Sequence, residues 1–82
     1  MISVRVKFFG PLRDIVQRDE LAIELPDECQ GSAAFEQLAF LHPDLRGWQK
    51  SVRLAVNLVY VQFSQRLKSG DEVSFIPPVS GG

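Results

Sequence analysis

The sequence has few of the side chains that enzymes use for catalysis. Its 82 residues include one histidine, His42, and one cysteine, Cys29. His42 precedes a proline at an expected helix end and Cys29 falls in an expected loop, so nothing in their spacing brings them to a carboxylate. One histidine and one cysteine also cannot form a C-x-x-C motif or a histidine pair for a metal ion. Because a glycine-rich phosphate loop is missing too, we expect no catalytic, metal or ATP site within the chain itself.

The sequence also lacks an excess of positive charge, a long apolar run and a second cysteine. Nine Lys and Arg residues against ten Asp and Glu give a net charge of −1, whereas nucleic-acid binding needs a basic surface. The segment Met1–Arg5 alternates instead of forming the apolar core of a signal peptide, and no run reaches membrane-spanning length. A lone cysteine fits a reducing compartment. We therefore expect one small cytoplasmic domain that binds neither nucleic acid nor a membrane.

Apolar and polar residues alternate in several parts of the sequence. Apolar residues recur at every second position in five short segments, as in strands with one buried face. The expected strands cover residues 2–8, 21–25, 52–56, 59–63 and 73–75. Pro26 stops the second strand, which we expect to lie antiparallel to the first. Asn57-Leu58 is expected to form a tight hairpin turn, because asparagine tolerates positive φ.

Two further segments show helical spacing. Gly10-Pro11 opens a short helix of about two turns that ends near Gln17 or Arg18. The main helix is expected from Gly31 to His42, and Pro43 ends it.

The start of the main helix has two possible caps, Ser32 for a shorter helix or Gln30 as a poor cap. Residues 44–50 are expected to form a loop with Trp48 against the body of the domain. Five strands, one long helix and one short helix indicate an α+β fold with both helices packed on one face of a sheet.

The last seven residues, Ile76-Pro77-Pro78-Val79-Ser80-Gly81-Gly82, are chemically distinctive. The two prolines lack backbone donors, so the chain must leave any sheet at Pro77. From Val79 to Gly82 the side chains become smaller, and a Gly-Gly end fits a channel that is too narrow for other residues. At roughly 3.3 Å per residue the tail reaches on the order of 20 Å, far enough to enter the active site of a neighbouring protein. The alternative is a frayed and inert terminus.

Four segments together resemble those of a known family. Gly70-Asp71-Glu72-Val73 precedes the tail Pro77-Pro78-Val79-Ser80-Gly81-Gly82, Val6-Lys7-Phe8-Phe9-Gly10-Pro11-Leu12-Arg13-Asp14 stands near the start, and Leu54-Ala55-Val56-Asn57 lies between them. These segments are similar to a G-D-E-V strand, a P-P-V-[ST]-G-G tail and an F-F-x-x-[LV]-R-[ED] helix entry. They resemble the ubiquitin-like sulfur carriers, above all the small subunit of molybdopterin synthase.

The resemblance implies a ubiquitin-like β-grasp fold. Its five-stranded mixed sheet would hold the first and last strands parallel at the centre, with residues 1–76 as the domain and residues 77–82 as an extended tail. The start of the main helix departs from the family, in which a turn glycine, a threonine cap and a hydrophobic residue are usual. Glu28, Gln30 and Gly31 stand at those positions.

The same resemblance implies a sulfur-carrying function. An adenylating, E1-like partner would use ATP to convert the Gly82 carboxylate to an acyl-adenylate, and a persulfide sulfur donor would displace AMP to leave a thiocarboxylate. The tail would thread into the large subunit of molybdopterin synthase and give its sulfur to cyclic pyranopterin monophosphate, forming the dithiolene of molybdopterin. The threading residues would be Pro77, Pro78, Val79, Ser80 and Gly81. The chain would bind no cofactor and catalyse nothing alone, as the sulfur-donating subunit of a heterotetramer with two large subunits.

Surface residues near the tail are candidates for docking. Alternation leaves Ile76 pointing outward beside the prolines, where it would either contact a partner or pack on its own domain. Arg5 and Lys7, with Arg53 nearby, would either steer an acidic partner or form an ordinary solvated face.

Three other functions stay open at this stage. The chain could carry sulfur for thiamine thiazole synthesis, or be conjugated to lysines as a ubiquitin-like modifier. It could also be an interaction module with an inert tail, and deleting Gly81-Gly82 would then change nothing.

Overall fold

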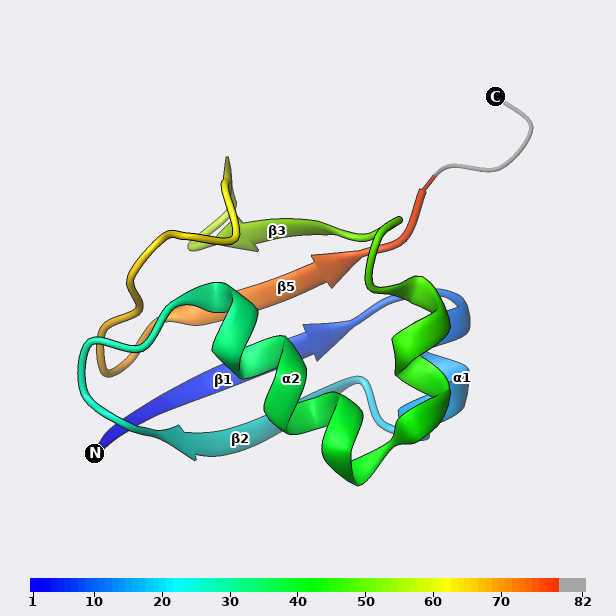
Figure 1. The fold of residues 1–82 in the computed structure, drawn as a ribbon, viewed down its shortest axis with the longest axis horizontal. Coiled ribbons are helices and arrows are strands. Elements are labelled where there is room, and N and C mark those ends of the chain that lie inside the picture. Colours follow the sequence, from blue (N-terminus) through cyan, green and yellow to red (C-terminus); the bar gives the residue numbers. More distant parts are fainter. Residues whose placement is uncertain (79–82) are drawn as a thin grey trace.

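The computed structural model describes residues 1–78, and Val79, Ser80, Gly81 and Gly82 lie outside the described residues. The described part contains five strands, two α-helices and one 3-10 helix (Figure 1). In chain order these are β1 (Ile2–Phe8), α1 (Pro11–Val16), β2 (Glu20–Leu25), α2 (Gly31–Leu41), η1 (Pro43–Trp48, the 3-10 helix), β3 (Arg53–Val56), β4 (Val59–Val61) and β5 (Glu72–Ile76).

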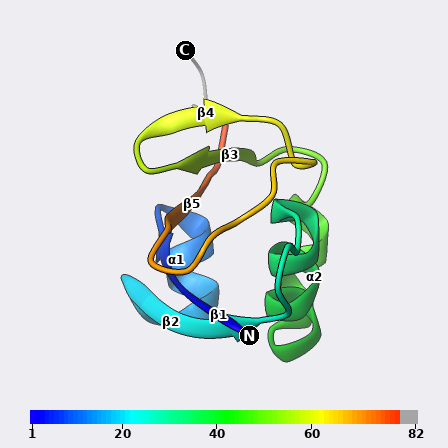
Figure 2. The same cartoon turned by 90° about the vertical axis from the view of Figure 1, so that its left-hand side faces the viewer.

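The strands form one mixed sheet in the order β2-β1-β5-β3-β4. β1 and β5 are parallel, and the other neighbouring pairs are antiparallel. This order places β5 in the middle of the sheet and leaves β2 and β4 at its edges (Figure 2). The expected α+β fold is confirmed, and so is the parallel pairing of the first and last strands that the family resemblance implied.

The hydrophobic core lies between α2 and the sheet, with α2 on one side of the strands (Figure 2). The buried apolar side chains of the helical segments are Leu12, Val16, Ala34, Phe35, Leu38, Ala39 and Leu45. Phe35 meets the rings of Phe75 and Phe63 edge to face, with centroids 5.1 Å and 6.5 Å away. Full burial of one such side chain stabilises the fold by about 1.5–3 kcal/mol, so this aromatic contact fastens α2 to the last strand.

The start of α2 is capped by backbone carbonyls instead of a side chain. Gln30 is the N-cap residue and makes no side-chain capping bond, which decides between the two expected caps. The N–H groups of Gly31 and Ser32 donate to the carbonyl oxygens of Gln65 and Phe63, at 2.9 Å and 3.0 Å. These bonds satisfy two of the N–H groups that a helix start leaves without intrahelical partners.

Two local expectations were wrong. Residues 44–48 are not a loop but belong to η1, whose Leu45 is buried in the core. A six-residue 3-10 helix makes only two turns of three residues, too few repeats for a hydrophobic pattern to reveal. The fourth strand ends at Val61, because Phe63 leaves the sheet and packs against the core.

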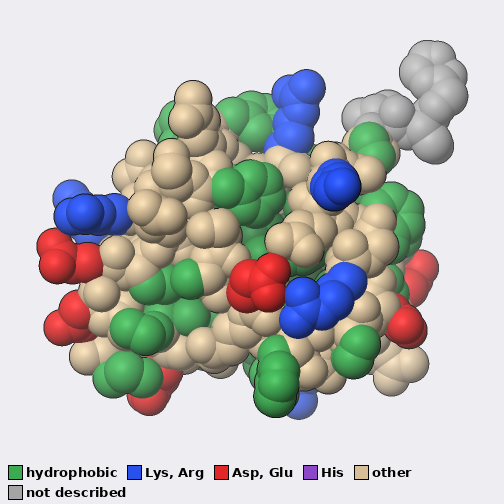
Figure 3. All heavy atoms as spheres, viewed as in Figure 1, with side chains coloured by type: hydrophobic (Ala, Val, Ile, Leu, Met, Phe, Trp, Pro, Cys, Tyr) green, Lys and Arg blue, Asp and Glu red, His purple; other side chains and the backbone are tan. Residues whose placement is uncertain are grey.

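The surface over α2 carries charges of both signs. Acidic and basic side chains are interspersed on this face with apolar ones (Figure 3). Glu36 and Arg46 form an ion pair there at 3.1 Å, and this contact and a hydrogen bond from Gln49 hold the pKa of the Glu36 carboxyl below its usual range. This face therefore presents no field of one sign to a partner.

Candidate functional site

The root of the tail, Ile76-Pro77-Pro78, leaves the centre of the sheet. Phe75 pairs with Phe8 of β1 in parallel register, and Ile76 is opposite Arg53 of β3. Pro77 follows the last paired residue, and it has no N–H with which to continue the ladder. The chain therefore departs beside the end of β1, at the same end of the sheet as α1 (Figure 1).

An apolar groove lies on one side of this root. It is lined by Phe9 and Gly10 between β1 and α1, by Pro11 at the start of α1, and by the root itself. Gly10 has φ of 55°, and a Cβ atom there would lie 3.5 Å from Pro77 Cγ. That distance is an ordinary contact, so glycine is favoured here by the positive φ and not by the space that the proline ring needs.

A second groove, on the other side, mixes apolar and polar groups. Its lining from the body of the domain consists of Ser51, Arg53 and Tyr60, and the root completes it. Ile76 is half-buried between the two grooves. The structure thus places the candidate docking residue where the sequence expected it, at the start of the tail. Its contact with a partner stays a prediction.

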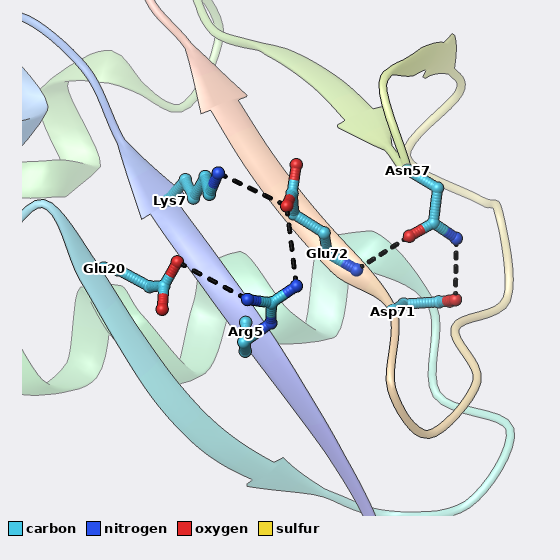
Figure 4. Close-up of polar contacts among 6 residues, drawn as sticks. All are labelled: Arg5, Lys7, Glu20, Asn57, Asp71 and Glu72. Atoms are coloured by element: carbon cyan, nitrogen blue, oxygen red, sulfur yellow. Dashed lines mark hydrogen bonds and ion pairs between the residues drawn. The ribbon is translucent and has the colours of Figure 1, made fainter.

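Charged residues on the open face of the sheet largely neutralise one another. Glu72 lies 3.3 Å from Lys7 Nζ and 3.6 Å from Arg5 Nη2, and Arg5 also lies 4.0 Å from Glu20 (Figure 4). Arg53 is not part of this cluster, since β5 separates its strand from β1. The expected basic surface of three cations is therefore divided, and two of them already have carboxylate partners.

Asn57 fastens the β3–β4 hairpin to the start of β5. Its Nδ2 donates to Asp71 Oδ1 at 3.0 Å, and its Oδ1 accepts from the Glu72 N–H at 3.0 Å (Figure 4). The other carboxylate oxygen of Asp71 accepts from the Lys68 N–H at 2.8 Å. Asp71 and Glu72 are thus fixed in place. The A-V-N and G-D-E-V motifs were the signal for this contact, but only the strand register joins them.

Cys29 and His42 do not contribute a second site. Burial raises the pKa of the Cys29 thiol, and its Sγ donates to the carbonyl of Gln30 at 3.4 Å, so little thiolate is present at neutral pH. His42 ends α2, where its backbone N–H donates to Leu38. Among residues 1–78 no three His, Cys, Asp or Glu side chains gather as a metal site would require. No helix in the same part of the chain has the length and apolar character to cross a membrane.

Comparison with known proteins agrees with this geometry. The sequence pattern of the ThiS family matches residues 6–82. Over 83 residues the chain is 35% identical to the molybdopterin synthase sulfur carrier subunit of Chlamydomonas reinhardtii, covering 99% of this chain and 100% of that protein.

Two solved structures extend the likeness to three dimensions. A Pyrococcus furiosus protein assigned as subunit 1 of a molybdopterin converting factor has a TM-score of 0.86 and 31% identity, over 96% of this chain and 100% of its own. A chain from the Helicobacter pylori complex of subunits 1 and 2 of molybdopterin-converting factor has a TM-score of 0.69 and 27% identity, over 99% of this chain and 100% of its own.

Fold and tail root together define the class, a ubiquitin-like β-grasp protein whose tail leaves the middle of the sheet. The chain belongs to the ThiS family. Its resemblance to the sulfur-carrier small subunits of molybdopterin synthase, first seen in the motifs, is confirmed by the full-length relatives.

Proposed function

We propose that this protein is the sulfur-carrier small subunit of a molybdopterin synthase and carries sulfur on the Gly82 carboxylate. The observation that carries the proposal is the position of the tail root, Ile76-Pro77-Pro78, which continues the central strand of a fold shared with sulfur carrier subunits. The two prolines, which end the strand, and the small side chains that follow them suit insertion into another protein. Val79, Ser80, Gly81 and Gly82 lie outside the described residues, so their role rests on the sequence motif.

The proposed chemistry needs two activations that the chain does not supply. A carboxylate is a poor acyl donor until one oxygen becomes a leaving group. An E1-like partner adenylates Gly82 with ATP and releases pyrophosphate. The outer sulfur of a persulfide donor then displaces AMP to form an acyl disulfide. A second thiol cleaves the S–S bond, which leaves sulfur in place of one carboxylate oxygen and converts the two thiols to a disulfide. The thiocarboxylate is a nucleophile at neutral pH, and it sits at the end of a slender tail.

The acceptor step takes place inside the large subunit. The tail enters its active site, and two rounds of transfer convert cyclic pyranopterin monophosphate to the dithiolene of molybdopterin. The large subunit supplies the acid–base and electrostatic groups. One observation supports this division of labour: a related small subunit has been solved in complex with its subunit 2.

Intact-mass measurement tests the loading step. The protein is incubated with ATP, a sulfur donor and the adenylating enzyme of its own source. We expect a gain of about 16 Da from replacement of oxygen by sulfur, absent when Gly82 is deleted and retained in Phe40→Ser, an exposed change on α2. No gain with an enzyme that loads another carrier would overturn the proposal. Isopeptide bonds from Gly82 to lysines would instead indicate a protein modifier.

A second assay tests the acceptor. The loaded protein is mixed with the large subunit and cyclic pyranopterin monophosphate, and formation of molybdopterin is followed. We expect product in proportion to the thiocarboxylate consumed. Loading without transfer to the pterin, together with transfer to a thiazole precursor, would move the protein to the thiamine pathway.

A further inference from the structure

Arg53 differs from the other basic residues of the sheet face in having no carboxylate partner among the described residues. Of the nine Lys and Arg residues, five lie within 4.0 Å of a carboxylate oxygen: Arg5, Lys7, Arg13, Arg46 and Arg66. Arg53 is the one of the remaining four that lines the groove beside the tail root. Its charge is therefore available at the place where the tail begins.

The Arg53 side chain is also held in position. Its guanidinium carbon lies 5.9 Å from the centroid of the Tyr60 ring, within the range of a cation–π contact. Tyr60 is on the neighbouring strand β4, and Arg53 is directly opposite Ile76 in the ladder with β5. A guanidinium fixed over a ring loses less side-chain entropy when it binds a carboxylate than a freely moving one.

The surroundings of Arg53 suit a protein partner. Ile76, Pro77 and Pro78 give one wall of the groove, and Ser51 and Tyr60 add a hydroxyl each. Tyr60 is 61% exposed. An exposed aromatic ring of this size commonly becomes an anchor residue when a partner protein covers it. The apolar strip and the arginine beside it are therefore complementary to a partner segment that carries both an apolar side chain and a carboxylate.

We propose that Arg53 binds a carboxylate of the large subunit when the tail enters it, and that this ion pair selects the partner. The inference rests on the proposed function. The large subunit is the partner to which the comparisons point, because a related small subunit is known in complex with subunit 2. Arg5 and Lys7 cannot serve equally, since Glu72 already lies close to both. Because the guanidinium can form two parallel hydrogen bonds with one carboxylate, this contact favours one orientation of docking.

Binding of the purified large subunit to charge variants tests the inference. Arg53→Gln removes the charge, Arg53→Glu reverses it, and Arg53→Lys keeps the charge without the planar donors. Lys68→Glu is the matched control, because it makes the same charge reversal before the start of β5, at the opposite end from the tail root, and no ion pair involves Lys68 among the described residues. Thermal unfolding of each variant confirms that the domain is folded before titration.

We expect Arg53→Gln to weaken binding about tenfold and Arg53→Glu more, with Arg53→Lys in between. Lys68→Glu should stay within about threefold of the unchanged protein. The dependence of the dissociation constant on salt should be smaller in Arg53→Gln, because one charge pair is gone.

Three results would overturn the inference in distinguishable ways. Equal binding of Arg53→Gln and the unchanged protein would remove the ion pair and leave the sulfur-carrier function intact. Unimpaired binding to the large subunit combined with slower adenylation would assign the carboxylate to the adenylating enzyme instead. If the unchanged protein does not bind the large subunit, the proposed function fails and the inference fails with it.

Discussion

Glu28 adopts a backbone conformation that residues with a Cβ atom disfavour. Its φ is 60°, in the left-handed region, which costs an L-residue about 1–2 kcal/mol relative to glycine. Its exposed ion pair with Arg66, at 3.5 Å, offsets little of that cost. This is the position at which the family resemblance led us to expect a turn glycine.

We predict that Glu28→Gly raises the free energy of unfolding by about 0.5–1 kcal/mol. The relief of backbone strain in the turn stabilises the folded state. This gain exceeds two opposing contributions, the loss of the ion pair and the larger conformational entropy of the unfolded chain. Urea unfolding measures it. Glu28→Ala is the control, because it removes the ion pair and keeps the Cβ atom. Equal stability of the two variants would show that the turn is not strained.

Gly31, at the start of α2, is buried against β3. A Cβ atom built there overlaps Leu54 Cδ2 and lies 3.4 Å from the Phe63 carbonyl oxygen. We predict that Gly31→Ala lowers the free energy of unfolding by about 1–3 kcal/mol, because a filled core must shift to admit a methyl group. Ser32→Ala, one residue further along the same helix and exposed, should change it by less than about 0.5 kcal/mol.

A double variant separates this clash from other effects of the Gly31 substitution. In a Leu54→Ala background the overlapping methyl group is absent, so Gly31→Ala should cost almost nothing. A penalty of the same size in both backgrounds would place its cause elsewhere in the helix start.

At the level of elements, the β3–β4 hairpin depends on its turn and on its bond to β5. Asn57 and Leu58 both have positive φ, 51° and 70°, as a two-residue hairpin turn of the primed type requires. Asparagine tolerates this conformation, whereas leucine does not. The side chain of Asn57 also binds Asp71 and the Glu72 backbone, so one residue shapes the turn and positions the next strand.

We predict opposite effects for glycine at the two turn positions. Asn57→Gly keeps the turn but loses both side-chain hydrogen bonds, and should destabilise the domain by about 1–2 kcal/mol. Leu58→Gly relieves an exposed strained residue and should stabilise it by up to about 1 kcal/mol. Guanidinium unfolding of both variants measures the difference. A stabilising Asn57→Gly would mean that its bonds to β5 contribute little.

The elements differ in how well the sequence predicts them. The strict alternation from Ile2 to Phe8 predicts β1 well, because Val4, Val6 and Phe8 are buried on one face. The predicted fourth strand, residues 59–63, is longer than β4, because Phe63 continues the alternation but packs against the core. The pairing of β1 with β5 came from the family resemblance, since alternation identifies a buried face and not the neighbouring strand.

The candidate site was predictable only in part. The prolines of the tail root are visible in the sequence, because a missing N–H ends a strand whatever surrounds it. The groove around Arg53 and Tyr60 depends on which residues of β3, β4 and β5 are opposite one another. That register follows from the turn at Asn57 and from packing on the core, and no spacing within a single segment reveals it.

For the whole molecule, the arrangement of the sheet decides how firmly the tail is anchored. β1 and β5 each have a strand on both sides, and Val6 and Val73, which pair with each other, are completely buried. β4 is a three-residue edge strand with exposed Val59 and Tyr60. The tail root therefore continues a central strand, which cannot separate from the sheet without exposing the core.

Native-state hydrogen exchange, followed by NMR at increasing urea concentration, tests this hierarchy. We predict that the slowest amides of β1 and β5 exchange only through global unfolding, and that protected amides of β4 exchange with an opening free energy lower by at least about 2 kcal/mol, because an edge strand separates without exposing the core. Deletion of Gly82 should leave both classes unchanged. Amides of β5 that exchange as readily as those of β4 would mean that the end of the last strand opens locally.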